Sequence, residues 1–595
     1  MVTEKGLSEK TICDVVNYKE DIAPYPLVKI YSGVGSGKSY FATKMITGSE
    51  EYKIPEQNVL IITSRKSKVK ETLKEMGILI TDEITKNGNL STEVYQTGET
   101  MPYAYDKYLK EIKVFYDEEE HTVLSYNKSV VCTNAFVAAY LRHVHRNDDP
   151  TTHIWNKFDA IIVDEVHSLV TDATYQSATF DVLALLQEYL RRYQNNQLQE
   201  CACKHLILMT GTPEPFEALV KFDVPENLTN KLVLFDRCKN VVPKNVILID
   251  AVTAQRKIQE LLINKEKVIY FTNHILTPSS AKKKFNFHDE INIGVSFSNE
   301  DKMRTFSAEE QAKFDELHES LSAKSLIPND IQFFVTTSRN KEGINVHNKD
   351  FRNMFVETHL MYDAVQMAGR VRSGVENFYI ITDAEQFDCK GSFLDKTFSK
   401  KVMVANKDIS NSADEANIFL KNEYFKEGRD DCSEELFEKI SYYVKYIERI
   451  YPYVRYDVFE RKFKFFSIKE DAEEMTDLQK NKFSQALLTD SNEYFKRWFS
   501  NSAIKREISA REEAKVYLEH LLGKSKWIRL SKTELKEHLS VIRDLFGSKL
   551  KSANPILHLV DEMYNCKESG DHYILFYGKE DPRTKKIPMK KRRKH

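Results

Sequence analysis

Short, nearly continuous apolar runs alternate with longer segments of helical periodicity between about residues 26 and 400. Such runs are typical of strands that are buried on both faces of a parallel sheet and connected by helices. Two sets of strands are predicted, separated by the polar stretch "DRCKNVVPK" at 236–244. The predicted strands are 27–32, 58–64, 129–134, 160–165 and 205–211 in the first set, and 245–250, 267–272, 291–298, 331–338, 353–358 and 377–382 in the second.

The pattern changes beyond about residue 400, where the strand-like runs stop and helical periodicity dominates. The clearest helical segments are 412–425, 433–450 and 508–522. We therefore expect an α/β fold of two tandem parallel-sheet domains, followed by a mainly α-helical C-terminal domain. The predicted limits are 1–240 and 241–400 for the two α/β domains, 401–580 for the helical domain and 581–595 for a basic tail.

The stretch "IYSGVGSGKSYFATKMI" at 30–46 places a glycine-rich loop between the first predicted strand and a helix. Glycines allow backbone N–H groups to approach phosphate oxygens, and the helix N-terminus adds partial positive charge. In this pattern the lysine neutralises the β- and γ-phosphates, and the hydroxyl after it binds Mg²⁺. The alternative is a glycine turn without a ligand. The loop predicts a site for ATP and Mg²⁺ formed by Gly33, Gly35, Ser36, Gly37, Lys38 and Ser39.

Two carboxylates follow the buried strand in "FDAIIVDEVHSL" at 158–169. Asp164 at the strand tip is placed to bind Mg²⁺, and Glu165 is placed to polarise the water that attacks the γ-phosphate. Taken alone, an Asp-Glu pair after a strand is often a helix cap. Together with the glycine loop, the pair favours phosphoryl transfer to water.

Composition narrows the class of protein further. A chain of 595 residues exceeds what one hydrophobic core covers, so about three or four domains are expected. No apolar run is long enough to cross a bilayer, and we expect no membrane partner. Eight scattered cysteines indicate a reducing intracellular compartment, either the cytoplasm or, if the basic tail is an address, the nucleus. Because the net charge is only −2, any affinity for nucleic acid has to come from a local, positively charged part of the surface.

At these residues the chain resembles the helicases of superfamily 2, whose second motif is DEAD, DEAH or a variant, here "DEVH" at 164–167. The resemblance covers about residues 26–385 and implies two RecA-like P-loop domains with ATP bound between them. The other motifs stand in the expected order. They are 61–67 and 131–137 for motifs Ia and Ib, 208–213 for motif III, 268–274 for motif IV, 334–346 for motif V and 366–372 for motif VI.

The resemblance also implies roles for single residues. Thr210 and Thr212, with His167, would couple the state of the nucleotide to the nucleic acid. Glu342 and Gly343 of motif V would contact the nucleotide. The residues implied to contact nucleic acid are Thr63, Ser64, Arg65, Thr133, Asn134, Thr272, Asn273 and Thr337.

Motif VI, "QMAGRVR" at 366–372, implies that arginines from the second domain reach across to the triphosphate. The first domain has no arginine placed to meet the charge on the γ-phosphoryl group, and an arginine finger accelerates its transfer by orders of magnitude. Gln366 would approach the nucleotide. The second arginine stands one place earlier than in the commoner Q-x-x-G-R-x-x-R pattern. We therefore expect Arg370 at the γ-phosphate, with Arg372 assisting.

The sequences of these motifs, "DEVH" and the compact "QMAGRVRS" above all, are similar to those of origin-binding-protein-type helicases of large DNA viruses, phages and plasmids. This resemblance implies an ATP-dependent helicase or translocase on single-stranded or forked DNA, with replication proteins as candidate partners. An RNA helicase is the first alternative, and an ATP-clamped initiator or sensor that does not unwind is the second. The sequence does not indicate the oligomeric state.

Two features beyond residue 400 have more than one interpretation. The stretch 440–466 interleaves tyrosine and phenylalanine with lysine and arginine, which is typical either of core packing or of stacking on unpaired bases. The basic tail "KKIPMKKRRKH" at 585–595 is interpreted as a nucleic-acid tether, a nuclear address or a solubilising segment.

Overall fold

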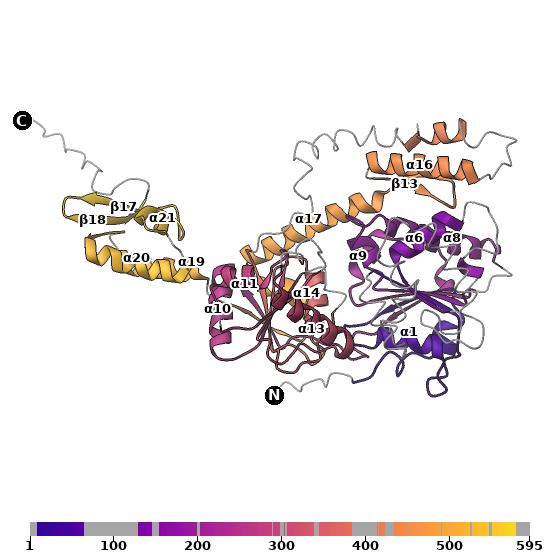
Figure 1. The fold of residues 1–595 in the computed structure, drawn as a ribbon, viewed down its shortest axis with the longest axis horizontal. Helices are drawn as coiled ribbons and strands as arrows, with labels where there is room; N and C mark the ends of the chain where they lie inside the picture. The colour runs from indigo at the N-terminus through magenta and orange to yellow at the C-terminus, as the bar shows by residue number, and fades with distance from the viewer. Residues whose placement is uncertain are drawn as a thin grey trace, which may run out of the picture.

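The structure is a computed structural model of the chain, shown in Figure 1. It describes residues 9–64, 129–144, 154–156, 158–198, 203–287, 290–297, 303, 306–337, 344–383, 413–414, 416–422, 434–451, 453–489, 491–507, 509–523, 526–546 and 550–578. The predicted basic tail lies outside these residues, as do Arg65, Glu342 and Gly343. None of the helices within the described ranges combines the length and apolar character that a membrane crossing needs.

The first lobe is built on a six-stranded sheet in which every neighbouring pair is parallel, with the order β3-β2-β4-β5-β1-β6. Five of its strands, β1 to β5, coincide with the first predicted set, because each is a buried apolar run. The sixth, β6, was not predicted; it is an edge strand with only partly buried side chains. The strands are β1 (Leu27–Tyr31), β2 (Val59–Thr63), β3 (Val130–Thr133), β4 (Ala160–Asp164), β5 (His205–Thr210) and β6 (Thr229–Val233).

Helices cover this sheet and enclose one large apolar cluster. Strand residues such as Ile61, Ile162 and Leu208 are fully buried in it, and Phe41 and Leu185 contribute from the helices. The helices are α1 (Lys38–Thr47), α6 (Asn134–Val144), α7 (Ser168–Thr171), α8 (Ala178–Gln194) and α9 (Glu214–Leu219).

The second lobe has a seven-stranded parallel sheet with the order β15-β7-β12-β11-β8-β10-β9. Alternate residues of β7 face two separate apolar clusters, with Val246 and Leu248 on one side and Ile247 and Ile249 on the other, so both faces of the sheet are buried. Six of its strands match the second predicted set: β7 (Asn245–Ile249), β8 (Val268–Thr272), β9 (Ile293–Ser296), β10 (Phe333–Thr337), β11 (Asn353–Val356) and β12 (Asn377–Ile381). Its helices include α10 (Ala251–Ile263), α11 (Pro278–Phe285), α13 (Ala308–Lys324) and α14 (Met361–Ala368).

The C-terminal region is mainly helical, but the prediction that strands stop near residue 400 is wrong. The described part of this region contains six short strands, and one of them, β15 (Ala503–Arg506), adds to the edge of the second lobe's sheet beside β7. These strands are not predicted from apolar runs, because they are short and largely exposed on one side. The remaining elements are α16 (Glu434–Ile450), β13 (Val454–Asp457), β14 (Lys462–Phe465), α17 (Ser467–Leu488), α18 (Asn492–Trp498), α19 (Ala510–Leu522), β16 (Trp527–Ser531), α20 (Lys532–Phe546), α21 (Ala553–Leu557), β17 (Tyr564–Ser569) and β18 (His572–Tyr577).

A partly buried ion-pair cluster attaches α16 to the first lobe. Arg142 of α6 pairs with Asp181 of α8 through its Nε at 3.1 Å, and with Glu448 of α16 through its Nη1 at 2.9 Å. The planar guanidinium suits such a two-sided contact, because its donors form a rigid fork. In Figure 1, α16 accordingly lies above α6 and α8.

Helix α17 spans both lobes (Figure 1). Its first half contributes Ala472 to the apolar cluster of the first lobe, and its second half contributes Phe483 and Ala486 to a cluster of the second lobe. The same helix packs against α7 and α9. The two lobes are therefore joined by a rigid element as well as by the chain between β6 and β7.

The aromatic residues of 440–466 divide between core and surface. Phe463 is buried, and Tyr443 and Tyr453 pack against the same small cluster, so core packing is confirmed for these rings. Tyr442 and Tyr446, in contrast, are 76% and 54% exposed on α16. A stacking role for these two rings stays a prediction. The domain limits at residues 240, 400 and 580 also stay predictions.

Candidate active site

The glycine-rich loop joins β1 to α1 in a conformation that needs its glycines. Gly35 has φ +83° and Gly37, the N-cap of α1, has φ +89°, both in the left-handed region that side chains disfavour. Position 33 needs a glycine for a steric reason, because a Cβ there would lie 2.2 Å from the Asn240 side chain. The loop therefore has the tight, backbone-lined form that the sequence predicts.

Lys38 folds back over this loop. Its side chain is buried, and its Nζ donates to the carbonyl oxygens of Ser32 at 3.3 Å and Gly33 at 3.2 Å. The Ser36 hydroxyl lies 2.8 Å from that of Ser32, which closes the loop from inside. A buried ammonium at a helix N-terminus, beside turned-in amides, fits an anion such as a phosphate chain.

The two carboxylates of "DEVH" follow β4 at the carboxyl edge of the sheet. Asp164 is the last strand residue, paired in register with Met209 of β5, and its Oδ1 accepts the Glu165 N–H at 3.1 Å. Glu165 has φ +54°, a left-handed conformation that costs a non-glycine residue about 1–2 kcal/mol. The N–H of Val166 donates to Met209 at 2.9 Å and holds this turn in place.

His167 and the threonines of motif III form a polar cluster beneath Glu165. His167 Nδ1 lies 2.8 Å from the Thr210 hydroxyl and 3.5 Å from Glu165 Oε2. The Thr212 N–H donates to the Thr210 hydroxyl at 3.0 Å. All of these side chains are buried. The structure thus brings the predicted coupling residues together with the predicted water-orienting carboxylate.

Motif VI reaches this cluster from the second lobe. Gln366 of α14 places its Nε2 3.4 Å from Glu165 Oε2 and 3.3 Å from the Thr212 hydroxyl, so one amide touches motifs II and III together. Arg370 is held behind it, with Nη2 3.1 Å from Gln366 Oε1 and Nε 3.3 Å from the Gln366 carbonyl. Both Gln366 and Arg370 are buried.

The loop after α14 packs against the glycine-rich loop. A Cβ on Gly369 would lie 2.2 Å from Val34, and a Cβ on Gly35 would lie 3.9 Å from Arg372 Nη1. The Val241 N–H also donates to the Val34 carbonyl at 2.8 Å, which brings the chain between the lobes to the same place. Both motif VI arginines therefore lie on the side of the second lobe that faces the Lys38 loop.

Ser39 and Asp164 are the candidate Mg²⁺ ligands on this chain. The described residues contain no group of three or more His, Cys, Asp or Glu side chains that could hold a metal ion. Mg²⁺ is commonly held by one or two protein oxygens, with water and phosphate oxygens completing its shell. A serine hydroxyl after the loop and an aspartate at the tip of β4 fit that kind of site.

The predicted nucleic-acid residues lie at the carboxyl ends of the strands in both lobes. Thr63 of β2 is paired in register with Thr133 of β3, and Thr272 of β8 with Thr337 of β10. Ser64 follows β2 and Asn134 begins α6. All six are buried, whereas Asn273 is partly exposed. The structure thus forms two clusters, one per lobe, and their contact with a strand stays a prediction.

Glu357 is a site residue that the motifs do not include. Its carboxylate accepts hydrogen bonds from the Tyr270 hydroxyl at 2.6 Å, the Thr272 hydroxyl at 2.6 Å and the Asn273 N–H at 2.9 Å, and it pairs with Lys284 at 2.9 Å. Burial alone would raise the pKa of this carboxyl, but Lys284 and the hydroxyl donors hold it below its usual value. The sequence signal is a glutamate directly after the buried strand "NMFV".

Comparison with known families gives a match over the first lobe. Residues 26–215 match the family "Type III restriction enzyme, res subunit". No curated protein matches the sequence significantly.

Solved structures resemble the chain at low identity. The Escherichia coli DEAH/RHA helicase HrpB is 12% identical over 61% of this chain and 41% of that chain, with a TM-score of 0.37. S. cerevisiae Dbp5 bound to RNA and ADP BeF3 is 12% identical over 60% and 79%, with a TM-score of 0.36. The type ISP restriction-modification enzyme LlaBIII bound to DNA is 16% identical over 88% and 35%, with a TM-score of 0.36. This chain thus spans less than half the length of HrpB and of LlaBIII.

Proposed function

We propose that this chain is an ATP-hydrolysing enzyme of helicase superfamily 2 that moves along a DNA strand and unwinds duplex DNA in replication or repair. The contact of Gln366 with Glu165 and Thr212 carries the proposal, because it joins motifs II, III and VI across the two lobes. A contact between the lobes at the predicted water-orienting carboxylate is suited to coupling hydrolysis to movement of the lobes.

In the first lobe, the triphosphate would lie against the amides of the glycine-rich loop, with Lys38 at its β- and γ-phosphates. Ser39 and Asp164 would hold Mg²⁺, which supplies positive charge that offsets the charge of the phosphates. Glu165 would orient and polarise the attacking water. Its left-handed backbone conformation supports this role, because strained residues persist where the surrounding structure over-determines them, as at active sites.

In the second lobe, Arg370 and Arg372 would meet the charge that develops on the γ-phosphoryl group. The hydrogen bonds of Arg370 to Gln366 support this assignment, since they tie the arginine to a residue that already touches Glu165. Glu342 and Gly343 of motif V would contact the nucleotide from the same lobe.

The nucleic-acid strand would run over the carboxyl edges of both sheets. Thr63, Ser64, Arg65, Thr133 and Asn134 would hold it on the first lobe, and Thr272, Asn273 and Thr337 on the second. Contacts to phosphates make such binding independent of sequence and sensitive to salt. Alternate opening and closing of the lobes would then advance the two contacts along the strand.

DNA is favoured over RNA because the motif style resembles that of origin-binding-protein-type helicases. An RNA helicase and an ATP-clamped initiator or sensor are the alternative functions. The clamp is less favoured, because the chain has Glu165 and both motif VI arginines, which a clamp does not need for hydrolysis.

Steady-state ATP hydrolysis of the full chain tests the proposal. We expect single-stranded DNA to stimulate turnover, with single-stranded RNA of the same sequence giving a smaller effect. Glu165→Gln serves as the control for contaminating hydrolysis, because it should bind ATP but not turn it over. A turnover that neither polymer stimulates would refute the motor, and a preference for RNA would replace DNA with the first alternative.

A further inference from the structure

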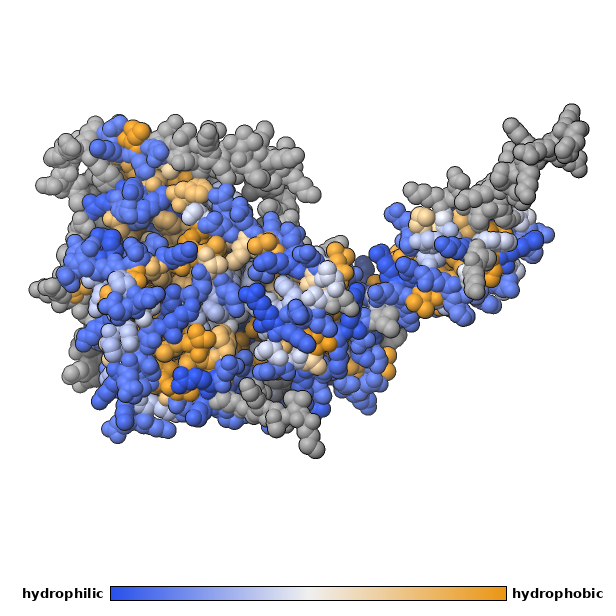
Figure 2. Space-filling model, turned by 180° about the vertical axis from the view of Figure 1, so that it is seen from behind, coloured by the Kyte–Doolittle hydropathy of each residue, from blue (hydrophilic) through white to orange (hydrophobic). Residues whose placement is uncertain are grey.

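Glu357 directly follows β11, at the carboxyl edge of the second lobe's sheet. Glutamates are almost never fully buried unless they are paired, and hydrophilic residues predominate on the surface that Figure 2 shows. Glu357 departs from this rule, because it is only 7% exposed. Its carboxylate therefore depends on partners inside the protein, and those partners indicate what it does.

The two carboxylate oxygens of Glu357 serve different neighbours. Oε1 accepts from the Tyr270 hydroxyl at 2.6 Å and lies 2.9 Å from Nζ of Lys284. Oε2 accepts from the Thr272 hydroxyl at 2.6 Å and from the Asn273 N–H at 2.9 Å. The Oε1 side balances the negative charge, because Lys284 brings a positive one. The Oε2 side holds the turn that follows β8.

Thr272 has already committed its hydroxyl inside this turn. The side chain is fully buried, and its single O–H hydrogen is donated to Glu357. Its oxygen also accepts the His274 N–H at 3.1 Å. A phosphate oxygen needs a donor, and this hydroxyl has no second hydrogen to offer. Thr272 can therefore act on a bound strand only through the turn that it closes.

Asn273 is the residue of this turn that reaches the surface. It is partly exposed, and both its backbone and its side chain are held by Glu357. The Asn273 N–H donates to the carboxylate, and the Asn273 Nδ2 donates to the Glu357 carbonyl oxygen at 2.7 Å. The nitrogen of a primary amide carries a second hydrogen, which can be donated to a phosphate oxygen.

We propose that Glu357 is a positioning residue, which fixes the turn after β8 so that the Asn273 amide donates to a phosphate of the bound strand. The inference rests on the proposed function, because that function supplies the strand. Glu357 itself does not touch the strand, since a carboxylate would repel a phosphate. Its pair with Lys284 keeps the charge beneath the contact balanced. Thr272 supports the same contact indirectly.

The affinity of the full chain for a fluorescent single-stranded oligothymidine, measured with a non-hydrolysable ATP analogue, tests this role. Glu357→Leu removes every acceptor at a similar volume and should weaken binding about tenfold, the order expected for one lost hydrogen bond to a charged group. Glu357→Gln should bind within about threefold of the wild type, because its oxygen still accepts from Thr272 and Asn273 while its amide donates to the Tyr270 hydroxyl.

Asn273→Ala tests whether Glu357 acts through Asn273. Alone it should weaken binding as much as Glu357→Leu does, and the combined variant should bind no more weakly than either, because both changes remove one contact. If Glu357→Leu does not fold, Thr272→Val, which removes the hydroxyl at equal size, takes its place in the comparison. Additive losses would overturn the inference, as would wild-type affinity in Asn273→Ala or equal losses in Glu357→Gln and Glu357→Leu.

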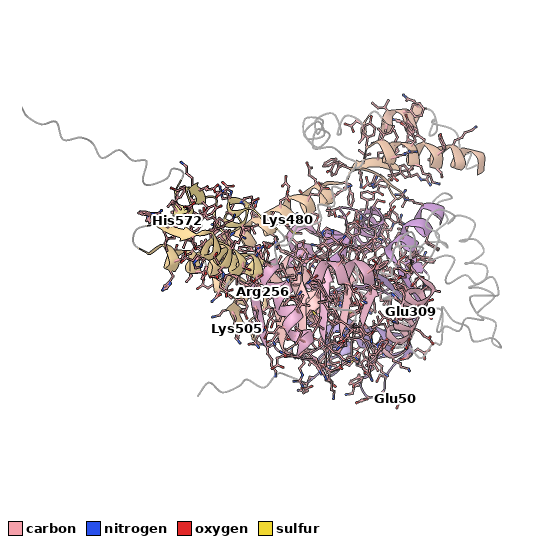
Figure 3. The ribbon with its side chains drawn as sticks, turned by 60° about the vertical axis from the view of Figure 1, so that its left-hand side comes forward. Glu50, Arg256, Glu309, Lys480, Lys505 and His572 are labelled. Atoms are coloured by element: carbon pink, nitrogen blue, oxygen red, sulfur yellow. The ribbon has the colours of Figure 1, made fainter. Side chains whose placement is uncertain are left out.

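The matched control is Glu309→Leu, which removes a carboxylate from an exposed lysine pair of the same lobe. Glu309 of α13, labelled in Figure 3, lies 2.9 Å from Nζ of Lys313. The strand affinity of this variant should equal that of the wild type. If single strands do not stimulate ATP turnover while the Glu357 and Asn273 variants still lose affinity together, the motor fails and the positioning role stands. A wild-type chain without affinity for the strand would overturn both.

Discussion

Gln366 of the second lobe contacts the first lobe within the candidate site. It donates toward Glu165 and Thr212 of one lobe and accepts from Arg370 of its own. A neutral amide can do both at once, because it carries a donor and an acceptor on the same planar group. We therefore expect the side chain to position the proposed water-orienting carboxylate, Glu165, relative to the arginine.

Gln366→Ala removes this bridge and should lower ATP turnover by about 10- to 100-fold, because misplaced catalytic groups lose that much. ATP affinity should change only a few-fold, since Lys38 and the glycine-rich loop are untouched. The measurement is kcat and KM for ATP with saturating single-stranded DNA. Gln311→Ala, at a partly exposed position of α13, is the matched control. Equal kcat in the two variants would show that Gln366 does not belong to the site.

Glu217, in the first lobe, predicts how the free energy of unfolding depends on pH. It pairs with Lys29 of β1 at 2.8 Å and Lys231 of β6 at 2.7 Å, and it accepts from the Tyr31 hydroxyl. Burial alone would raise the pKa of its carboxyl, but these three donors lower it from 4.5 to about 2. A folded-state pKa below the unfolded value adds stability above about pH 4.5, and that stability is lost as the pH falls toward 2.

Glu217→Gln should therefore lower the free energy of unfolding at pH 7 by about 1–2 kcal/mol, a figure reduced for the partial exposure of the carboxylate. The difference from the wild type should shrink between pH 4.5 and pH 3. Urea unfolding at several pH values measures it, with Glu226→Gln at an exposed position as control. A difference that does not change with pH would show that the ion pairs do not stabilise this edge.

At the scale of elements, the apolar runs predict eleven strands of the two parallel sheets, and all eleven are found. β6 and β13–β18 were missed because their sequences mix polar and apolar side chains that are only partly buried. The motifs likewise predict which side chains meet, since the carboxyl ends of parallel strands share one edge. Glu357, the bridge through α17 and the contact of Asn240 with the glycine-rich loop depend on tertiary packing that no local pattern encodes.

Helix α17 couples the lobes by packing, and Phe483 is its anchor in the second lobe. The ring is fully buried, stacks on His359 with centroids 4.5 Å apart and meets Phe495 edge-on at 5.7 Å. Phe483→Ala should lower the free energy of unfolding by about 3–5 kcal/mol, the usual cost of removing a buried phenyl ring.

Leu478→Ala is the matched control, because Leu478 lies on the same helix and is 51% exposed. It should change the free energy of unfolding by less than about 0.5 kcal/mol. Denaturant unfolding of both variants gives the comparison. Equal stability of the two would mean that α17 is not anchored in the second lobe through this ring.

At the scale of the whole molecule, the candidate site lies where the two lobes meet, and helix α17 of the C-terminal region packs on both lobes. The glycine-rich loop and the carboxylates belong to the first lobe, and the motif VI arginines belong to the second. Helix α17 packs on α7 and α9, which follow motifs II and III, and then enters the second lobe. Conformational changes at the candidate site can therefore reach the C-terminal region through α17 and the helices on which it packs.

Single-turnover ATP hydrolysis by Arg370→Ala, with ATP affinity measured on the same protein, tests whether the second lobe completes the site. If a triphosphate is cleaved between the two lobes, the rate should fall about 10³-fold or more, while ATP affinity changes only a few-fold. Hydrolysis at close to the wild-type rate would contradict a site completed by the second lobe.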